Sequence, residues 1–215
     1  MGFFIYKGLD NFAQGNRIVS VKGLAEKEVM ANKVSWPIAF TDIGNNLPTV
    51  YTNISKNNEI IVAFLEGKGI PKEEISISAP IVVDLGADRY NRDNYVYRYN
   101  VTSVITVTSN NVTKVQELIL QQSELLKKGI PINSSDYRFQ IDYSFTELNK
   151  IKPQMIEEAT NNARAAAKKF ADDSKSKVGK IKRANQGQFS ITNRDNNTHH
   201  IKTVRVVTSI DYFLK

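Results

Sequence analysis

Residues 34–41 read Val-Ser-Trp-Pro-Ile-Ala-Phe-Thr, and this stretch decides the fold class. Its large apolar side chains recur at every second position from Val34 to Phe40. Because successive side chains of a strand point to opposite faces, this period predicts a strand with one buried and one solvated face. Such strands are typical of antiparallel sheets. Pro37 has no N–H to donate, so we expect this strand to run at a sheet edge or to carry a bulge there.

The same alternation recurs in later segments of the chain. These segments are residues 75–83, 95–107, 137–145 and 204–214. Three other segments change to helical spacing, with one apolar face each between Leu47 and Leu65 and between Val112 and Leu126. The third helical segment carries a narrow apolar stripe made of Met155, Ala159, Ala163, Ala166 and Phe170. The small alanines indicate that this helix packs closely against a sheet or another helix.

The first two helices end in the same four residues. Lys68-Gly69-Ile70-Pro71 is matched by Lys128-Gly129-Ile130-Pro131 sixty positions later. Lysine suits the negative end of a helix, and glycine adopts the left-handed conformation that stops it. Isoleucine packs back on the last turn, and proline prevents continuation. The repeat favours an internal duplication of a helix–strand unit, although any two helices can share an efficient stop.

These segments predict an α+β fold, with largely antiparallel sheets packed by three helices in the order β-β-α-β-β-α-β-α-β-β. Polar stretches at residues 84–94 and 185–200 are predicted to be long loops or hairpin tips. No linker rich in proline, glycine or serine divides the chain. We therefore expect residues 17–215 to form a single domain with two related lobes.

Composition excludes several classes of chemistry. The chain has 215 residues, 41% of them hydrophobic, which is enough to bury a core without disulfides or metal. Cysteine is absent, which excludes disulfides, thiol nucleophiles, cysteine-ligated zinc and iron–sulfur clusters. The absence of cysteine does not determine the cellular compartment, because an exported protein with an adequate core needs no disulfide.

The N-terminal residues 1–16 contain a short apolar run, Gly2–Tyr6, followed at once by Lys7. A bilayer span needs about 20 apolar residues, and the run also lacks the features of a signal peptide. Two interpretations stand: a plain mobile terminus, or the stump of a membrane anchor that has been removed.

Motifs for catalysis and metal binding are missing from the sequence. No Gly-x-Ser-x-Gly elbow occurs, and Gly67-Lys68-Gly69 is too short for a phosphate loop. His199 and His200 are adjacent, so on a strand they would point to opposite faces; we favour solvated residues over a metal contact. We therefore predict no catalytic, cofactor-binding or metal-binding residues, while a hydrolase with an unrecognised carboxylate site stays a third alternative.

One polar loop carries acids and tyrosines that admit two interpretations. Three aspartates there could meet a hard cation, but they lack the pattern of a calcium loop, so we favour a solvated tip. These aspartates are Asp84, Asp88 and Asp93. The nearby tyrosines could stack on bases or sugars beside arginines, although a core or subunit-facing role is simpler. These tyrosines are Tyr90, Tyr95, Tyr97 and Tyr99.

Positive charge is concentrated between Arg164 and Arg183. Eight basic and two acidic residues there account for +6 of the formal net charge of +7. The segment could bind acidic lipid, nucleic acid or an acidic protein. The candidate anion-binding residues are Arg164, Lys168, Lys175, Lys177, Lys180, Lys182 and Arg183. We favour the simpler interpretation of a wet helix face with i,i+4 pairs from Lys168 to Asp172 and from Lys169 to Asp173, with lysines complementing the helix end. Nucleic acid is not expected, because no base-reading motif is present.

Several motifs together resemble the SIMPL-domain family of bacterial envelope proteins, also called domain of unknown function 541. The opening Ile18–Gly23 resembles the first strand of the family, and Lys68–Pro71 followed by Glu74–Ile77 resembles its helix-to-strand step. Glu158–Lys168 resembles the alanine-rich helix of the family, and Val178–Ile181 fits its exit. The resemblance runs from Arg17 to Lys215; the basic run 175–183 and the polar segment 185–200 depart from it.

This resemblance implies an α+β fold and no agreed catalytic residues. It also implies export to the periplasm or attachment to the envelope, and some relatives form ring-like oligomers or are linked to stress resistance. We therefore expect a non-enzymatic cell-envelope protein that acts by oligomeric assembly or partner binding. Its expected partners are further copies of itself, an envelope protein, and the inner membrane through an N-terminal segment preceding residue 1. The alternative is an anion-binding module that uses residues 164–183.

Overall fold

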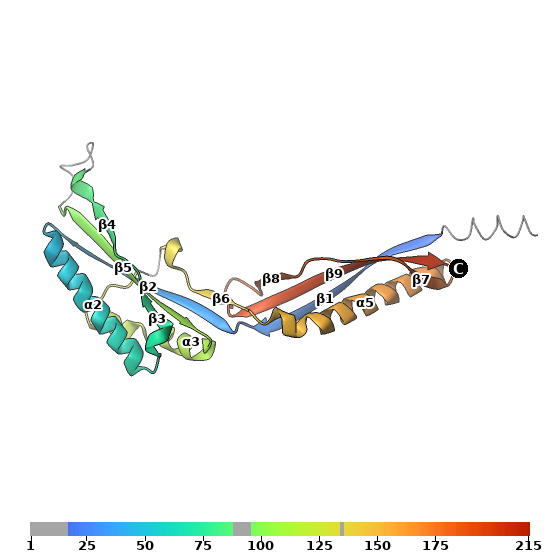
Figure 1. Cartoon of the computed structure of the whole chain (residues 1–215), viewed down its shortest axis with the longest axis horizontal. Coiled ribbons are helices and arrows are strands. Elements are labelled where there is room, and N and C mark those ends of the chain that lie inside the picture. The colour runs from blue at the N-terminus through green and yellow to red at the C-terminus, as the bar shows by residue number, and fades with distance from the viewer. Residues whose placement is uncertain (1–16, 88–95, 134–135) are drawn as a thin grey trace, which may run out of the picture. The chain divides into compact units, whose positions relative to one another are not determined.

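The computed structural model describes residues 17–87, 96–133 and 136–215 (Figure 1). The chain divides into two compact units. The first unit combines the segment that ends at Met30 with Phe145–Lys215, and the second unit is Ala31–Ser144. The predicted stump at residues 1–16 lies outside the described residues.

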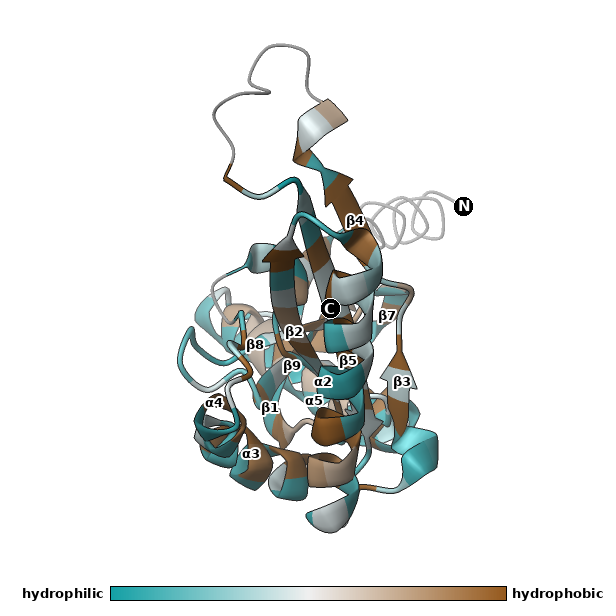
Figure 2. Ribbon diagram, turned by 90° about the vertical axis from the view of Figure 1, so that its left-hand side faces the viewer, coloured by the Kyte–Doolittle hydropathy of each residue, from teal (hydrophilic) through white to brown (hydrophobic). Residues whose placement is uncertain are grey.

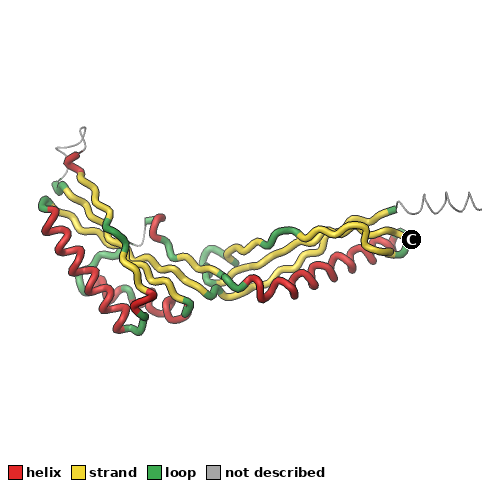
Figure 3. Tube along the Cα trace, in the orientation of Figure 1, coloured by secondary structure: helices red, strands yellow, loops and turns green. Residues whose placement is uncertain are grey.

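The first unit is an antiparallel sheet with one long helix along it (Figure 3). Its elements are β1 (Ile18–Met30), α5 (Leu148–Asp173), β7 (Val178–Gln186), β8 (Ser190–Asn193) and β9 (Ile201–Leu214). The order is β1-β9-β7, and β8 also pairs with β9. β1 pairs with β9 over its whole length, from Ile18 opposite Phe213 to Met30 opposite Ile201.

The predicted loop at residues 185–200 is in part wrong, because β7 extends to Gln186 and β8 follows from Ser190. Their polar side chains are exposed, and the pairing with β9 is made by the backbone. Composition alone therefore gives no sign of these strands.

α5 packs on the sheet through a row of small residues at four-residue spacing. The buried row is Met155, Ala159, Ala163, Ala167 and Ala171. The predicted stripe was wrong at its C-terminal end, since Ala166 is only partly buried and the side chain of Phe170 is 59% exposed. An i,i+4 row is inclined to the helix axis, which lets it follow the twist of the strands below.

Gly23 of β1 is the point of closest approach between sheet and helix. A Cβ atom on Gly23 would lie 1.8 Å from the carbonyl oxygen of Ala159 and 2.4 Å from the backbone nitrogen of Ala163. The Asn162 side-chain amide also donates a hydrogen bond of 2.8 Å to the carbonyl of Leu24. The glycine and the alanine row thus form one packing unit in which two backbones touch.

The second unit is a five-stranded antiparallel sheet with helices on one face. Its strands are β2 (Lys33–Gly44), β3 (Ile75–Ile77), β4 (Ile81–Asp84), β5 (Tyr99–Ser109) and β6 (Asp142–Ser144). Its helices are α2 (Leu47–Gly67), α3 (Val112–Gln121) and α4 (Ser123–Lys127), with short 3₁₀ turns at Lys72–Glu74, Leu85–Ala87 and Tyr137–Phe139. The order is β3-β5-β2-β6, with β4 also on β5. Trp36, Ile38 and Phe40 of β2 lie in the core with α2 and α3.

The predicted fold class and element order are confirmed, although several segments are shorter or split. Residues 75–83 form β3 and β4, interrupted before Pro80, which cannot donate to the ladder. Residues 137–145 yield only β6, because the Asp136 side chain caps a 3₁₀ turn by accepting from the Arg138 N–H. The second helix breaks at Gln122, which buries Leu125 and leaves the predicted core residue Leu126 exposed.

β2 pairs with β5 along one of its two sides, and at Pro37 no described strand pairs with the other side. β6 pairs with β2 only at residues 33–35, and beyond Pro37 the described contact is a single bridge from Phe40 to Ile132. The expected unpaired edge is therefore found at this position within the described residues.

The repeated helix stop is confirmed in atomic detail. Gly69 and Gly129 have φ of 86° and 80°. The Ile70 N–H donates to the Leu65 carbonyl at 3.0 Å, and the Ile130 N–H donates to the Leu125 carbonyl at 3.1 Å. These are the six-residue bonds of a Schellman motif, and both isoleucines are buried. Both stops lie in the second unit, and different structures follow them: β3 after Ile70, and the bridge of Ile132 after Ile130.

α5 ends with the same motif but with lysine in the glycine position. The Ser176 N–H donates to the Ala171 carbonyl at 2.8 Å, and Lys175 has φ of 53°. A side chain other than glycine is strained in this conformation by about 1–2 kcal/mol.

We expect Lys175→Gly to raise the free energy of unfolding by about 1 kcal/mol, because relief of strain exceeds the added entropy of the unfolded chain. Urea denaturation measures this change. Lys175→Ala removes the same charge but keeps the Cβ atom, so it should leave stability near the starting value. A glycine variant no more stable than the alanine variant would contradict the assignment.

Candidate functional site

The structure gathers three of the seven candidate basic residues around one cavity of the first unit. Arg164 and Lys168 lie one turn apart on α5, and Lys180 lies on β7. The cavity has a volume of about 360 Å³. Its remaining lining residues are Val178, Gly179, Ile181 and Tyr212. We call these seven residues the α5–β7 pocket.

The other four candidate residues do not line this pocket. Lys175 is at the end of α5, and the backbone of Lys177 pairs with that of Lys215. The ammonium of Lys182 lies 5.8 Å from the centre of the Phe213 ring. Arg183 of β7 is opposite Asp211 of β9. The basic segment is therefore not one continuous surface.

The three pocket cations have no acidic partner in the part of the chain that the structure describes. The predicted pair of Lys169 and Asp173 is present at 3.6 Å, but Lys168 makes no such pair with Asp172. Among the described residues, no acid lines the pocket. The pocket is thus positively charged and uncompensated.

Tyr212 also lines the pocket. The alternation of residues 204–214 predicts only that its side chain is on the buried face of a strand. Its side chain is 2% exposed, and its hydroxyl has no hydrogen-bond partner among the described residues. Buried tyrosine hydroxyls are normally paired, so such an unpaired group stands out. The sequence offers one sign of this role: Tyr212 carries a polar group, although most residues on the buried face of segment 204–214 are apolar.

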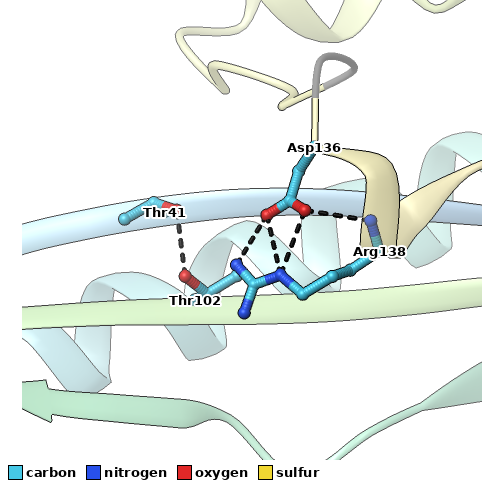
Figure 4. A network of polar contacts seen from close by, with 4 residues as sticks. All are labelled: Thr41, Thr102, Asp136 and Arg138. Atoms are coloured by element: carbon cyan, nitrogen blue, oxygen red, sulfur yellow. Dashed lines mark hydrogen bonds and ion pairs between the residues drawn. The ribbon is translucent and has the colours of Figure 1, made fainter.

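A separate polar network lies in the second unit (Figure 4). Thr41 and Thr102 share a hydrogen bond of 3.1 Å across β2 and β5, and Arg138 holds Asp136 with bonds of 3.0 and 2.6 Å. The Arg138 guanidinium lowers the pKa of Asp136 below its usual value. An ion-paired carboxylate of this kind stays ionised at neutral pH and makes a poor proton donor.

The predicted acidic and aromatic loop is only partly described. Asp84 is bound by Arg98 through two bonds of 3.0 and 2.9 Å, which lowers the pKa of this carboxyl. Asp88, Asp93, Tyr90 and Tyr95 lie outside the described residues. Tyr97 is exposed, and the Arg98 guanidinium lies 5.0 Å from the centre of the Tyr99 ring. His199 and His200 lie in the turn before β9.

Within residues 17–87, 96–133 and 136–215, no three histidine, cysteine or acidic side chains are grouped so that they could hold a metal ion. None of the helices in those ranges has the length and apolar character needed to cross a membrane.

β4 gives the second unit an apolar edge. Ile81, Val82 and Val83 are between 44% and 47% exposed although they belong to a strand. Figure 2 shows β4 coloured as hydrophobic. β4 pairs with β5 on one side, and no described strand pairs with its other side. Unpaired N–H and C=O groups along such an edge are a template for another strand.

Comparison with protein-family models identifies the family of the chain. The model of the SIMPL family, described as a protein of unknown function (DUF541), matches residues 19–204. The chain belongs to the SIMPL family. This SIMPL protein thus carries the family pattern through both units, from β1 to the first residues of β9. The earlier resemblance is confirmed, and the family itself has no assigned function. A search of curated proteins finds no match.

Proposed function

We propose that this SIMPL protein is a non-enzymatic cell-envelope protein that works by self-assembly, with β4 as the contact between copies. The single observation that supports this most strongly is the apolar, one-sided edge at Ile81–Asp84. Two copies of β4 related by a twofold axis would pair antiparallel and join two sheets. Each copy would then satisfy the free edge of the other.

Charge does not oppose this pairing. Edge strands are commonly protected by charged residues that repel a second edge. The charged residue of β4 is Asp84, and Arg98 neutralises its carboxylate through a bond of 2.9 Å. Ile81, Val82 and Val83 would therefore meet the same three residues of a second copy without like-charge repulsion.

The edge of the first unit differs in this respect. β1, an outer strand of that sheet, carries Lys22 and Lys27, which no described acid pairs, and Asn162 of α5 donates to its Leu24 carbonyl. Charged side chains and an occupied backbone acceptor both disfavour pairing with another strand. This contrast favours β4 over β1 as the assembly edge.

We expect Val82→Lys to abolish the concentration-dependent association of the purified protein. A strand of four residues makes a small interface, so the wild-type association should be weak and should grow with concentration. Sedimentation velocity over a concentration series measures it. The lysine would place two positive charges opposite each other across the twofold axis.

Leu120→Lys is the matched control, because Leu120 is an exposed apolar residue of α3 and the substitution adds the same charge. It should associate like the wild type. A wild-type protein that stays monomeric at the highest concentration, with no cross-linked partner in cells, would overturn the proposal. Equal loss of association in both variants would show that net charge alone is responsible.

We also propose a location at the periplasmic side of the inner membrane, held by an N-terminal segment preceding residue 1, and a role in envelope stress tolerance. This proposal rests on the resemblance to bacterial envelope proteins. Cell fractionation with an antibody against the described units tests the location, and recovery of the protein in the soluble cytoplasmic fraction would contradict it.

A further inference from the structure

We propose that the α5–β7 pocket binds a phosphate monoester, with the phosphate held by Arg164, Lys168 and Lys180 and with its organic part against the apolar wall. This site is independent of the assembly edge, because it lies in the first unit and shares no residue with β4.

The three positive charges of the pocket repel one another, so they favour a bound anion and do not by themselves stabilise the fold. Arg164 and Lys168 are an i,i+4 pair of like charge on α5, an arrangement that destabilises a helix. Lys180 adds a third positive charge from β7, and no acid of the described ranges lines the cavity. A bound anion would remove this repulsion.

A doubly charged phosphate fits these cations better than a carboxylate. A phosphate monoester carries a charge close to −2 at neutral pH, since its second pKa is about 6. The arginine guanidinium offers two parallel donors to phosphate oxygens, and the two lysines act as point charges. A single carboxylate would leave more of the positive charge unbalanced.

The walls of the pocket indicate an organic group on the phosphate. Val178 and Ile181 make part of the lining apolar. The volume of about 360 Å³ falls within the range of sites that enclose small organic molecules. A bare phosphate ion would leave these apolar residues without a contact.

Tyr212 supplies a neutral donor for the same phosphate. It lines the pocket, and its buried hydroxyl has no partner. The hydroxyl is buried, so a ligand reaches it only if neighbouring side chains shift. A hydrogen bond from this hydroxyl to a phosphate oxygen would satisfy a group that is otherwise costly to bury.

The separation of the basic residues argues against a nucleic acid duplex as the ligand. Duplex binding needs cations spread along a surface that follows the phosphate backbone. Here three cations converge on one cavity, while Lys182 and Arg183 are placed elsewhere on the sheet.

Isothermal titration calorimetry of the full chain at fixed ionic strength tests the site, with phenyl phosphate, inorganic phosphate and benzoate as probes. We expect phenyl phosphate to bind most tightly. Arg164→Gln and Lys168→Gln should each weaken it by about tenfold or more, the effect of losing a charged hydrogen bond. Tyr212→Phe should weaken it by about fivefold while the protein stays folded. Vesicles of phosphatidylcholine with and without phosphatidic acid distinguish a lipid source of the phosphate from a free one.

Lys175→Gln and Lys177→Gln are the matched controls, because each removes one charge of the same segment outside the pocket. They should leave the dissociation constant within about twofold, as expected for exposed, solvent-screened charges that do not line the pocket. Equal weakening by control and pocket variants would overturn the proposal in favour of general electrostatic attraction. If Tyr212→Phe binds phenyl phosphate as tightly as the wild type does, the Tyr212 hydroxyl does not contact the phosphate. Absence of Lys168-sensitive binding to both phenyl phosphate and phosphatidic acid vesicles would overturn the site altogether.

Discussion

Gly23→Ala is expected to destabilise the first unit by about 3 kcal/mol or more, at the upper end of what overpacking costs in a protein core. The new methyl carbon would lie 1.8 Å from the carbonyl oxygen of Ala159 and 2.4 Å from the backbone nitrogen of Ala163. Both neighbours are backbone atoms, so no side chain can rotate away. The whole of α5 would have to move off β1, which would open the buried alanine row.

Urea denaturation followed by circular dichroism measures this loss. Gly67→Ala is the control, because its Cβ atom would meet no heavy atom within 4 Å and the residue lies in the last turn of α2. Alanine in a helix should be neutral or stabilising by about 0.5–1 kcal/mol there. If Gly23→Ala unfolds at the same urea concentration as the wild type, the direct contact between α5 and β1 is incorrect.

Phe40→Ala is expected to cost the second unit about 3–5 kcal/mol, the usual range for removing a fully buried phenylalanine. Phe40 is completely buried in the core that β2 shares with α2 and α3. The cavity left behind would be bordered by a regular sheet and by capped helices, which limits how far it can collapse.

The single tryptophan makes this prediction easy to measure. Trp36 lies in the same core as Phe40, so its fluorescence reports the unfolding of the second unit. The fluorescence transition of Phe40→Ala should shift to a lower urea concentration. Tyr51→Ala serves as the comparison, because Tyr51 is an exposed aromatic residue of α2 and its loss should shift the transition little. Equal shifts in the two variants would contradict the assignment of Phe40 to this core.

The local features of the fold could be predicted because they depend on neighbours in sequence. The alternation of residues 34–41 specifies β2 directly, and Gly69 and Gly129 have the backbone conformation that a helix stop requires. The stop of α5 could not be recognised, since Lys175 occupies the glycine position and Ser176 replaces the isoleucine. The role of Gly23 depends on a helix more than a hundred residues away in sequence, which no local pattern reveals.

The pocket was predictable only in part. Helical spacing places Arg164 and Lys168 on one face of α5. The placement of Lys180 depends on register shifts between Val178 and Arg183, where β7 pairs irregularly with β9. In such a segment the alternation of residue types does not show which face of the sheet each side chain is on. Tyr212 enters through the packing of β9 under α5, which is a tertiary contact.

The full-length pairing of β1 with β9 has a consequence for how the protein is made. β1 leaves the ribosome well before β9, so Ile18 must wait for Phe213 before the ladder can close. The second unit, Ala31–Ser144, is continuous in the chain and can complete its own sheet during synthesis. The first unit can complete its sheet only after β9 has emerged, and until then the thirteen residues of β1 lack the strand with which they pair in the folded protein.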